Sequence, residues 1–192
     1  MRIPSKLAGA VLAAAAVTLL PAAASAHTDV RAAGTLKVVK TITQKKIDSA
    51  GLKSQLAVLL PDTLATGSTK PSSIKAQSFA SKGSYTLDLG VGKNCGGATA
   101  CLVAEFIGID NEKPHYKKKI KLAGGKTAYY KPLTCGGSCS PPAIEWRVGK
   151  VLYGIQYNTL KSGASAQRAD LVRLADQALA AGSRQTPSVG QL

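Results

Sequence analysis

The amino-acid sequence predicts an α+β fold: a curved antiparallel sheet of about five or six strands, with a C-terminal amphipathic helix packed on one face. Residues 84–157 contain short alternating or apolar segments joined by glycine-rich turns, which is the pattern of hairpin-connected strands. Residues 165–182 then carry apolar side chains at helical spacing. Such a stripe has to be buried, and the sheet is the available surface.

The expected strands are read in order along the chain. They are "SYTLDLG", "CLVAEFIGI", "YKKKIKL", "KTAYYK", "AIEWRV" and "KVLYGIQY". Gly149 and Lys150 separate the last two and are suited to a two-residue hairpin turn. In the helix Leu171, Leu174 and Ala178 share one face, and Gly182 is the expected stop.

Residues 1–26 have the features of an export signal. Arg2 and Lys6 precede an uncharged apolar run, and small residues lead to Ala26. The run at residues 7–20 is shorter than the roughly 20 residues that span a bilayer. We therefore expect a secreted, extracytoplasmic protein that begins at His27 and has no transmembrane segment in its mature part.

The remaining chain divides into three expected parts. Residues 27–83 form an N-terminal segment in which residues 45–60 suit a helix, stopped by Pro61. Residues 62–83 are rich in Ser, Thr, Lys and Gly, which indicates a long loop. Residues 84–182 form the disulfide-stapled α+β domain, and residues 183–192 form a flexible tail.

Four cysteines follow the expected signal. An exported chain favours disulfides over free thiols or zinc ligands. Short spacings with intervening glycines favour the pairs Cys95–Cys101 and Cys135–Cys139. Each bridge is expected to stiffen one loop and to contribute roughly 2 kcal/mol.

The chain is strongly basic, with a formal charge of +15 that falls to +13 without Arg2 and Lys6. Lys117, Lys119 and Lys121 project to one side if their segment is a strand, which predicts a basic stripe. Anionic cell-envelope polymers or lipids are the expected partners, and another protein is an alternative. Lysine without arginine or stacked aromatics does not predict specific nucleic-acid recognition. Lysines also protect edge strands from aggregation.

Catalytic and metal-binding patterns are sparse. The sequence holds no G-x-S-x-G, Walker A or G-x-G-x-x-G motif, and the interpretation leans against an enzyme. Glu105 and Glu145 can form an acid/base pair if their strands adjoin, and each is equally well explained as the outward residue of a half-buried strand. No cofactor is expected; the alternative is copper(II), held by the amine and imidazole of a mature N-terminal His27 with His115 as second ligand.

The sequence shows one internal similarity and one similarity to other proteins. At an offset of 40 residues Cys95 matches Cys135, and Glu105 before Phe106 matches Glu145 before Trp146; duplication and similar local physics both explain this. The segments "YTLDLG", "CGGATAC", "CGGSCSPPAIEW" and "GKVLYGIQY" resemble a group of uncharacterised secreted bacterial proteins. That resemblance implies a secreted domain with two staples and transfers no site residues.

The leading hypothesis is a secreted, non-enzymatic module that binds at the cell envelope through the lysine stripe or the stapled loops. Copper binding is one alternative. The other is a secreted protease inhibitor, because a stapled "CGGSCSPP" loop is a rigid bait.

Overall fold

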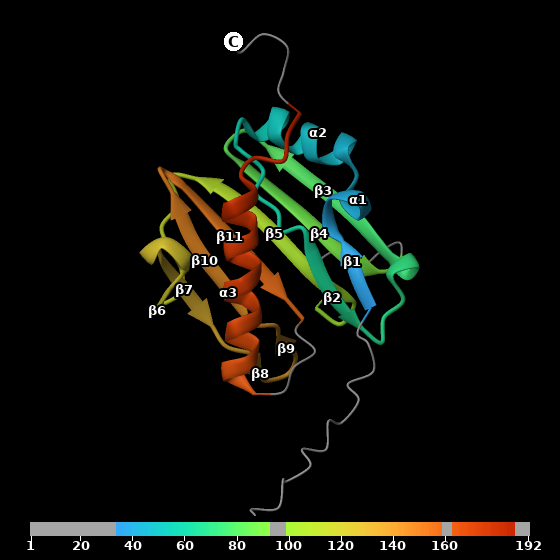
Figure 1. Cartoon of the computed structure of the whole chain (residues 1–192), viewed down its shortest axis with the longest axis vertical. Helices are drawn as coiled ribbons and strands as arrows, with labels where there is room; N and C mark the ends of the chain where they lie inside the picture. The colour runs from blue at the N-terminus through green and yellow to red at the C-terminus, as the bar shows by residue number, and fades with distance from the viewer. Residues whose placement is uncertain (1–33, 93–98, 159–162, 187–192) are drawn as a thin grey trace, which may run out of the picture. The chain divides into compact units, whose positions relative to one another are not determined.

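A seven-stranded antiparallel sheet forms the centre of the computed structural model, which describes residues 34–92, 99–158 and 163–186 (Figure 1). The strand order is β3-β4-β5-β11-β10-β7-β6. The strands are β3 (Ile74–Ser81), β4 (Ser84–Val91), β5 (Leu102–Asp110), β6 (Lys118–Lys121), β7 (Thr127–Lys131), β10 (Ala143–Val148) and β11 (Val151–Tyr157). The α+β prediction is confirmed, with one strand more than the upper expected number.

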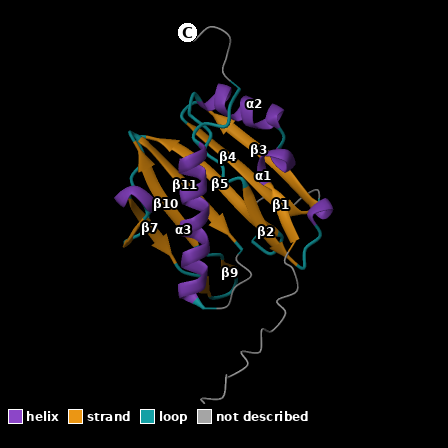
Figure 2. Cartoon of the chain, in the orientation of Figure 1, coloured by secondary structure: helices purple, strands orange, loops and turns teal. Residues whose placement is uncertain are grey.

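Helices and a two-stranded ribbon cover one face of this sheet (Figure 2). The covering elements are β1 (Gly34–Lys37), α1 (Val38–Ile42), α2 (Gln44–Ser54), β2 (Thr63–Gly67) and α3 (Ala164–Ala181). Helix α3 contacts β10 and β11, whereas α1 and α2 contact β3. The short elements are η1 (Pro71–Ser73), η2 (Ala123–Gly125), β8 (Thr134–Cys135) and β9 (Cys139–Ser140). Within the described residues, no helix has the length and apolar character needed to cross a membrane.

Alternation along the strands divides the sheet into a core face and an outer face. Tyr153, Ile155 and Tyr157 of β11 enter the core, as do Phe106 of β5 and Trp146 of β10. The turn at Gly149 and Lys150 is confirmed by the pairing of Val148 with Val151. The helix ends as expected, because Ala181 is its last residue and Gly182 follows with φ 66°.

Tyrosine hydroxyls attach the covering layer to the sheet. Tyr85 accepts a hydrogen bond from the N–H of Leu59 at 3.3 Å. Tyr153 and Tyr157 donate to the carbonyls of Ala57 and Ala65 at 3.1 and 2.6 Å. Each ring is buried, and a buried hydroxyl needs such a partner. The covering segment is therefore held at defined points rather than by apolar contact alone.

Three expectations about local structure are wrong. Residues 62–83 are not a loop, because they contain β2, η1 and β3. Helix α2 ends at Ser54 and not at Pro61, since Gln55 adopts the left-handed conformation and its N–H bonds to the carbonyl of Gly51. The described start of the expected flexible tail is bound, with the N–H of Arg184 donating to the Val58 carbonyl at 2.9 Å.

Gly108 lies where strand β5 meets the ring of Tyr85, and this contact makes a prediction. A Cβ added at Gly108 would lie 2.4 Å from Cε1 of that ring. We expect Gly108→Ala to lower the free energy of unfolding by about 1–3 kcal/mol, as overpacking does. Thermal denaturation measures the change. Gly136→Ala is the control because a Cβ there meets nothing within 4 Å; equal melting temperatures for both variants would contradict the packing.

Candidate functional site

A groove of about 670 Å³ runs between helix α2 and strand β3, which is an edge strand of the large sheet. Its helical side is lined by Thr43, Lys45, Lys46, Ser49 and Lys53. Its strand side is lined by Ala76, Gln77, Ser78, Phe79 and Ala80. The lining thus holds three ammonium groups and no carboxylate among the described residues.

The sequence of α2 separates a buried face from a charged face. Ile47, Ala50 and Ser54 are buried, and they recur three and four residues apart, as the inward side of a helix requires. Lys45, Ser49 and Lys53 recur every four residues on the other side. The helix therefore directs its polar side chains away from the core and over the edge of β3.

The carbonyl of Ala76 marks the free edge of β3. It accepts a hydrogen bond from Nζ of Lys46, a half-buried side chain. A lysine ammonium has three donors, so this bond leaves Lys46 able to contact a further acceptor. The groove therefore contains one half-buried lysine that is fixed by a hydrogen bond, Lys46, and two exposed lysines, Lys45 and Lys53.

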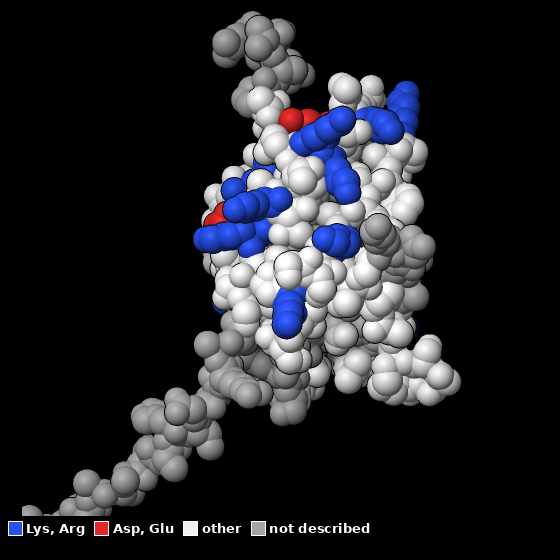
Figure 3. Space-filling model, turned by 90° about the vertical axis from the view of Figure 1, so that its right-hand side faces the viewer, with Lys and Arg blue, Asp and Glu red and all other residues white. Residues whose placement is uncertain are grey.

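The one acidic side chain of α2, Asp48, is bound to residues that do not line the groove. Asp48 accepts hydrogen bonds from the N–H of Thr186 at 2.8 Å and from Gln44 at 2.9 Å. The Thr186 bond, followed by the Gln44 bond, lowers the pKa of Asp48. On the side of the molecule that carries β3 in Figure 1, Lys and Arg outnumber Asp and Glu (Figure 3). The electrostatic field of this side favours anions.

The predicted lysine stripe lies at the opposite edge of the sheet. Lys119 and Lys121 belong to β6, Lys117 precedes it, and all three are exposed. Nζ of Lys121 donates to the Gly125 carbonyl and to Thr127 at 3.2 and 3.1 Å. The stripe is thus separated from the groove by the full width of the sheet. Sequence reasoning missed the lysines of α2 because they look like the solvated face of any helix.

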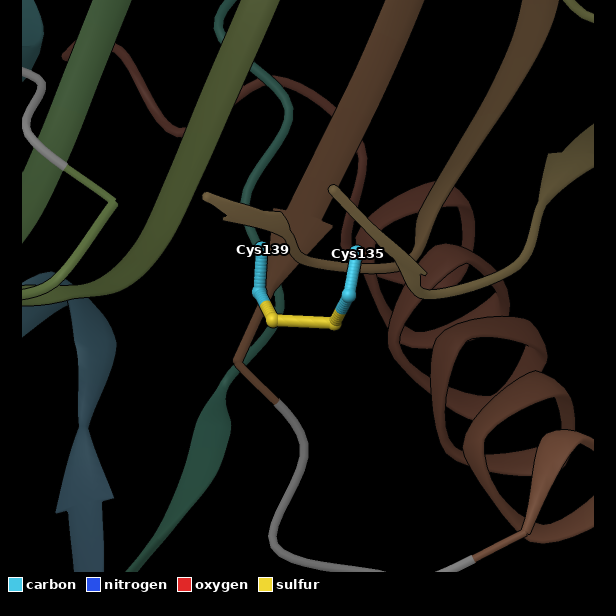
Figure 4. The surroundings of a disulfide bond; sticks show 2 residues. All are labelled: Cys135 and Cys139. Atoms are coloured by element: carbon cyan, nitrogen blue, oxygen red, sulfur yellow. A yellow bond between two sulfur atoms is a disulfide. The ribbon is translucent and has the colours of Figure 1, made fainter. Parts of the chain in front are cut away.

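The Cys135–Cys139 disulfide is confirmed (Figure 4). It joins β8 to β9, and residues 132–139 are exposed. Cys95 lies outside the described residues, so its pairing with Cys101 stays a prediction; Cys101 itself is not a free thiol. The stapled loop projects from the fold and does not line the groove.

Glu105 and Glu145 do not meet the condition for an acid/base pair. Their strands do not adjoin, because β11 lies between β5 and β10. Both line a cavity of about 30 Å³ with Tyr116, which is enough for water and too small for a substrate. Burial and the charge of Asp88, its cross-strand neighbour, raise the pKa of Glu105. Burial raises the pKa of Tyr116 to about 12.

Glu145, which lines this cavity, also holds His115. Glu145 accepts a hydrogen bond from the backbone N–H of His115 at 2.8 Å, and its other oxygen lies 2.9 Å from Nδ1. The imidazole is therefore held by a carboxylate, although its side chain is 53% exposed. No cluster of three or more His, Cys, Asp or Glu suited to a metal occurs among the described residues. His27 lies outside them, so the copper alternative stays a prediction.

The Glu145 contact predicts the titration of His115. This hydrogen bond raises the pKa of His115 above its ordinary value. The pKa of His115 is higher in the folded than in the unfolded chain. The contact therefore stabilises the fold fully at pH values below the unfolded pKa, and this stabilisation is lost as the pH rises through the folded pKa. An NMR titration of the ring should show a raised pKa that falls in Glu145→Gln. Glu112→Gln is the comparison variant. Its carboxylate lies 3.8 Å from Nε2 and raises the same pKa less than Glu145 does, so we expect a smaller fall; an unchanged pKa in Glu145→Gln would contradict the contact.

Comparison of the chain with protein-family models, with curated proteins and with solved structures found no match. The resemblance noted from the cysteine segments stays a prediction.

Proposed function

We propose that this protein is an exported, non-enzymatic module that binds an anionic partner at the cell envelope through the groove between α2 and β3. One observation carries the proposal: Lys45, Lys46 and Lys53 line a groove whose described lining contains no Asp or Glu. A concave surface of one charge concentrates counter-charged ligands more than a flat one.

The groove is a better candidate than the β6 stripe. Its lysines project from one rigid helix over a strand edge, and the hydroxyls of Thr43 and Ser49 lie among them. The stripe has part of its donor capacity used locally, since Lys121 bonds to Gly125 and Thr127. Its lysines instead fit the protection of an exposed edge.

The polar residues of the outer face support a binding role over catalysis. His115 and Glu145 are joined to each other, and the cavity beside them is too small for a substrate. The hydrogen bonds between Glu145 and His115 have a structural role, because they hold the segment around residue 115 against the sheet.

Binding to two labelled polyanions tests the proposal. Poly-L-glutamate and lipoteichoic acid present carboxylates and phosphodiesters respectively, and we expect the full chain to bind at least one at low salt. Fluorescence anisotropy should show weaker binding with rising salt, because the attraction is screened. The double variant Lys45→Gln/Lys53→Gln should weaken binding about fivefold to tenfold.

Lys119→Gln/Lys121→Gln is the matched control, because it removes the same charge from β6. We expect it to change affinity less than twofold. Equal losses in the two double variants would place the binding outside the groove, and the absence of binding to both polymers at low salt would end the proposal.

A second candidate, protease inhibition, is favoured by the stapled loop. Residues 132–139 are exposed around the Cys135–Cys139 bridge, and Leu133 is 43% exposed. A loop that is rigid before binding loses little entropy on binding.

For this candidate we expect slow, competitive inhibition of a secreted serine protease with a primary pocket for leucine. Leu133→Asp should abolish the inhibition, because a charge does not enter an apolar pocket. Rapid cleavage of the loop without inhibition in a chymotrypsin and subtilisin assay would reject this candidate.

A further inference from the structure

Among the residues that the structure describes, no strand pairs with the outer edge of β3. This edge faces the groove, and the hydrogen-bond pattern identifies the groups that it exposes. The N–H of Gly92 donates to the Ser73 carbonyl at 3.3 Å, so residue 73 belongs to the bonded set of the β3–β4 pair. Residues 75, 77, 79 and 81 follow the same parity. Residues 76, 78 and 80 therefore direct their N–H and C=O away from β4, in agreement with the bond from Lys46 to Ala76.

Helix α2 lies along this edge and is tied to β3 near one end and to the β3–β4 turn at the other. Lys46 bonds to Ala76, and the carbonyl of Ser54 accepts the N–H of Gly83 at 2.9 Å. Consecutive members of the set Lys45, Ser49 and Lys53 rise about 6 Å apart along the helix. Alternate residues of an extended strand lie about 6.6 Å apart. The charged face of the helix thus matches the repeat of a strand laid against β3.

The two sides of the edge differ in character. On the helix side β3 presents the small residues Ala76, Ser78 and Ala80 beneath the lysines. On the outer side it presents Phe79, which is 56% exposed. A strand added to β3 would alternate in the same way, with acidic side chains toward α2 and apolar side chains toward Phe79.

We propose that β3 accepts an extended segment of another protein, with alternating acidic and apolar residues, as an eighth strand of the sheet. This inference rests on the proposed function, because it names the partner of the same groove. The added backbone pairs with Ser78 and Ala80, as in other cases of strand addition. Its amide takes the Ala76 carbonyl, and Lys46 turns to a carboxylate of the partner.

Charge and hydrogen bonding select this partner over two others. A second copy of the chain would set the lysines of two α2 helices against each other, which is unfavourable. A phosphate polymer satisfies the lysines, but it has no regular series of donors and acceptors for the edge. An acidic strand supplies both.

A short labelled peptide of alternating Glu and Val, with blocked ends, is the probe. We expect the full chain to bind it at least tenfold more tightly than a peptide of the same composition with Glu and Val in separate blocks. Hydrogen exchange followed by NMR should show protection of the amides of Ser78 and Ala80 on binding. Their exchange in the free chain should be fast, because no strand in the described part of the chain pairs with them.

Ser78→Pro removes the outward N–H without changing charge, and an edge strand tolerates proline at such a position. It should weaken binding at least tenfold, whereas Ser78→Ala should stay within twofold. Equal affinity of both variants for the alternating peptide would overturn strand addition. So would the absence of protection at Ser78 and Ala80 when the unmodified chain binds the peptide. If the Ser78 amide is already protected from exchange in the free chain, the edge is paired with a second copy. That result would also overturn the proposed strand addition.

The outcomes separate this inference from the proposed function. If Ser78→Pro binds poly-L-glutamate and the alternating peptide as Ser78→Ala does, while Lys45→Gln/Lys53→Gln weakens both, the groove binds anions without strand pairing. If neither probe responds to the two lysines, the proposed function itself fails.

Discussion

The buried tyrosines of the central strands hold the covering layer on the sheet, and the groove depends on this attachment. A tyrosine contributes a large apolar ring to the core and a hydroxyl that requires a partner. Tyr85, Tyr153 and Tyr157 find that partner in the backbone of residues 57–65. Apolar burial alone is non-directional, so these bonds fix where the N-terminal layer lies along the strands.

The position of α2 follows from this arrangement. The helix ends at Ser54, only three residues before Ala57, whose carbonyl is bound by Tyr153. Its last carbonyl is bound by the N–H of Gly83 in the β3–β4 turn. The lysine-bearing face is therefore held beside the strand edge before any ligand arrives. Less side-chain and backbone entropy is lost on binding when the binding elements are already ordered.

Much of the sheet was predictable because its central strands alternate strongly or are continuously apolar, as in "KVLYGIQY". Strand β3 was not, because "IKAQSFAS" mixes small and polar residues that fit a half-covered edge. The candidate site was missed for the same reason. Its lysines were visible, but their proximity to β3 is a long-range relation that spacing along one helix does not reveal. The stapled Cys135–Cys139 loop was predictable, since both cysteines lie close together.

The order of the strands also bears on how the chain arose. Strands β5 and β10 both run antiparallel to β11 and lie on opposite sides of it. Strand β4 lies on the far side of β5 and strand β7 on the far side of β10, so the two hairpins are arranged in opposite order across the sheet. Superposing the second hairpin on the first requires a half-turn about the strand direction, which exchanges the two faces. Phe106 and Trp146 nevertheless point to the same core. No rotation therefore superposes the two similar 40-residue segments with the same side chains facing the core. Two unrelated hairpins with the same alternation of buried and exposed residues explain the similarity better than duplication of one ancestral hairpin.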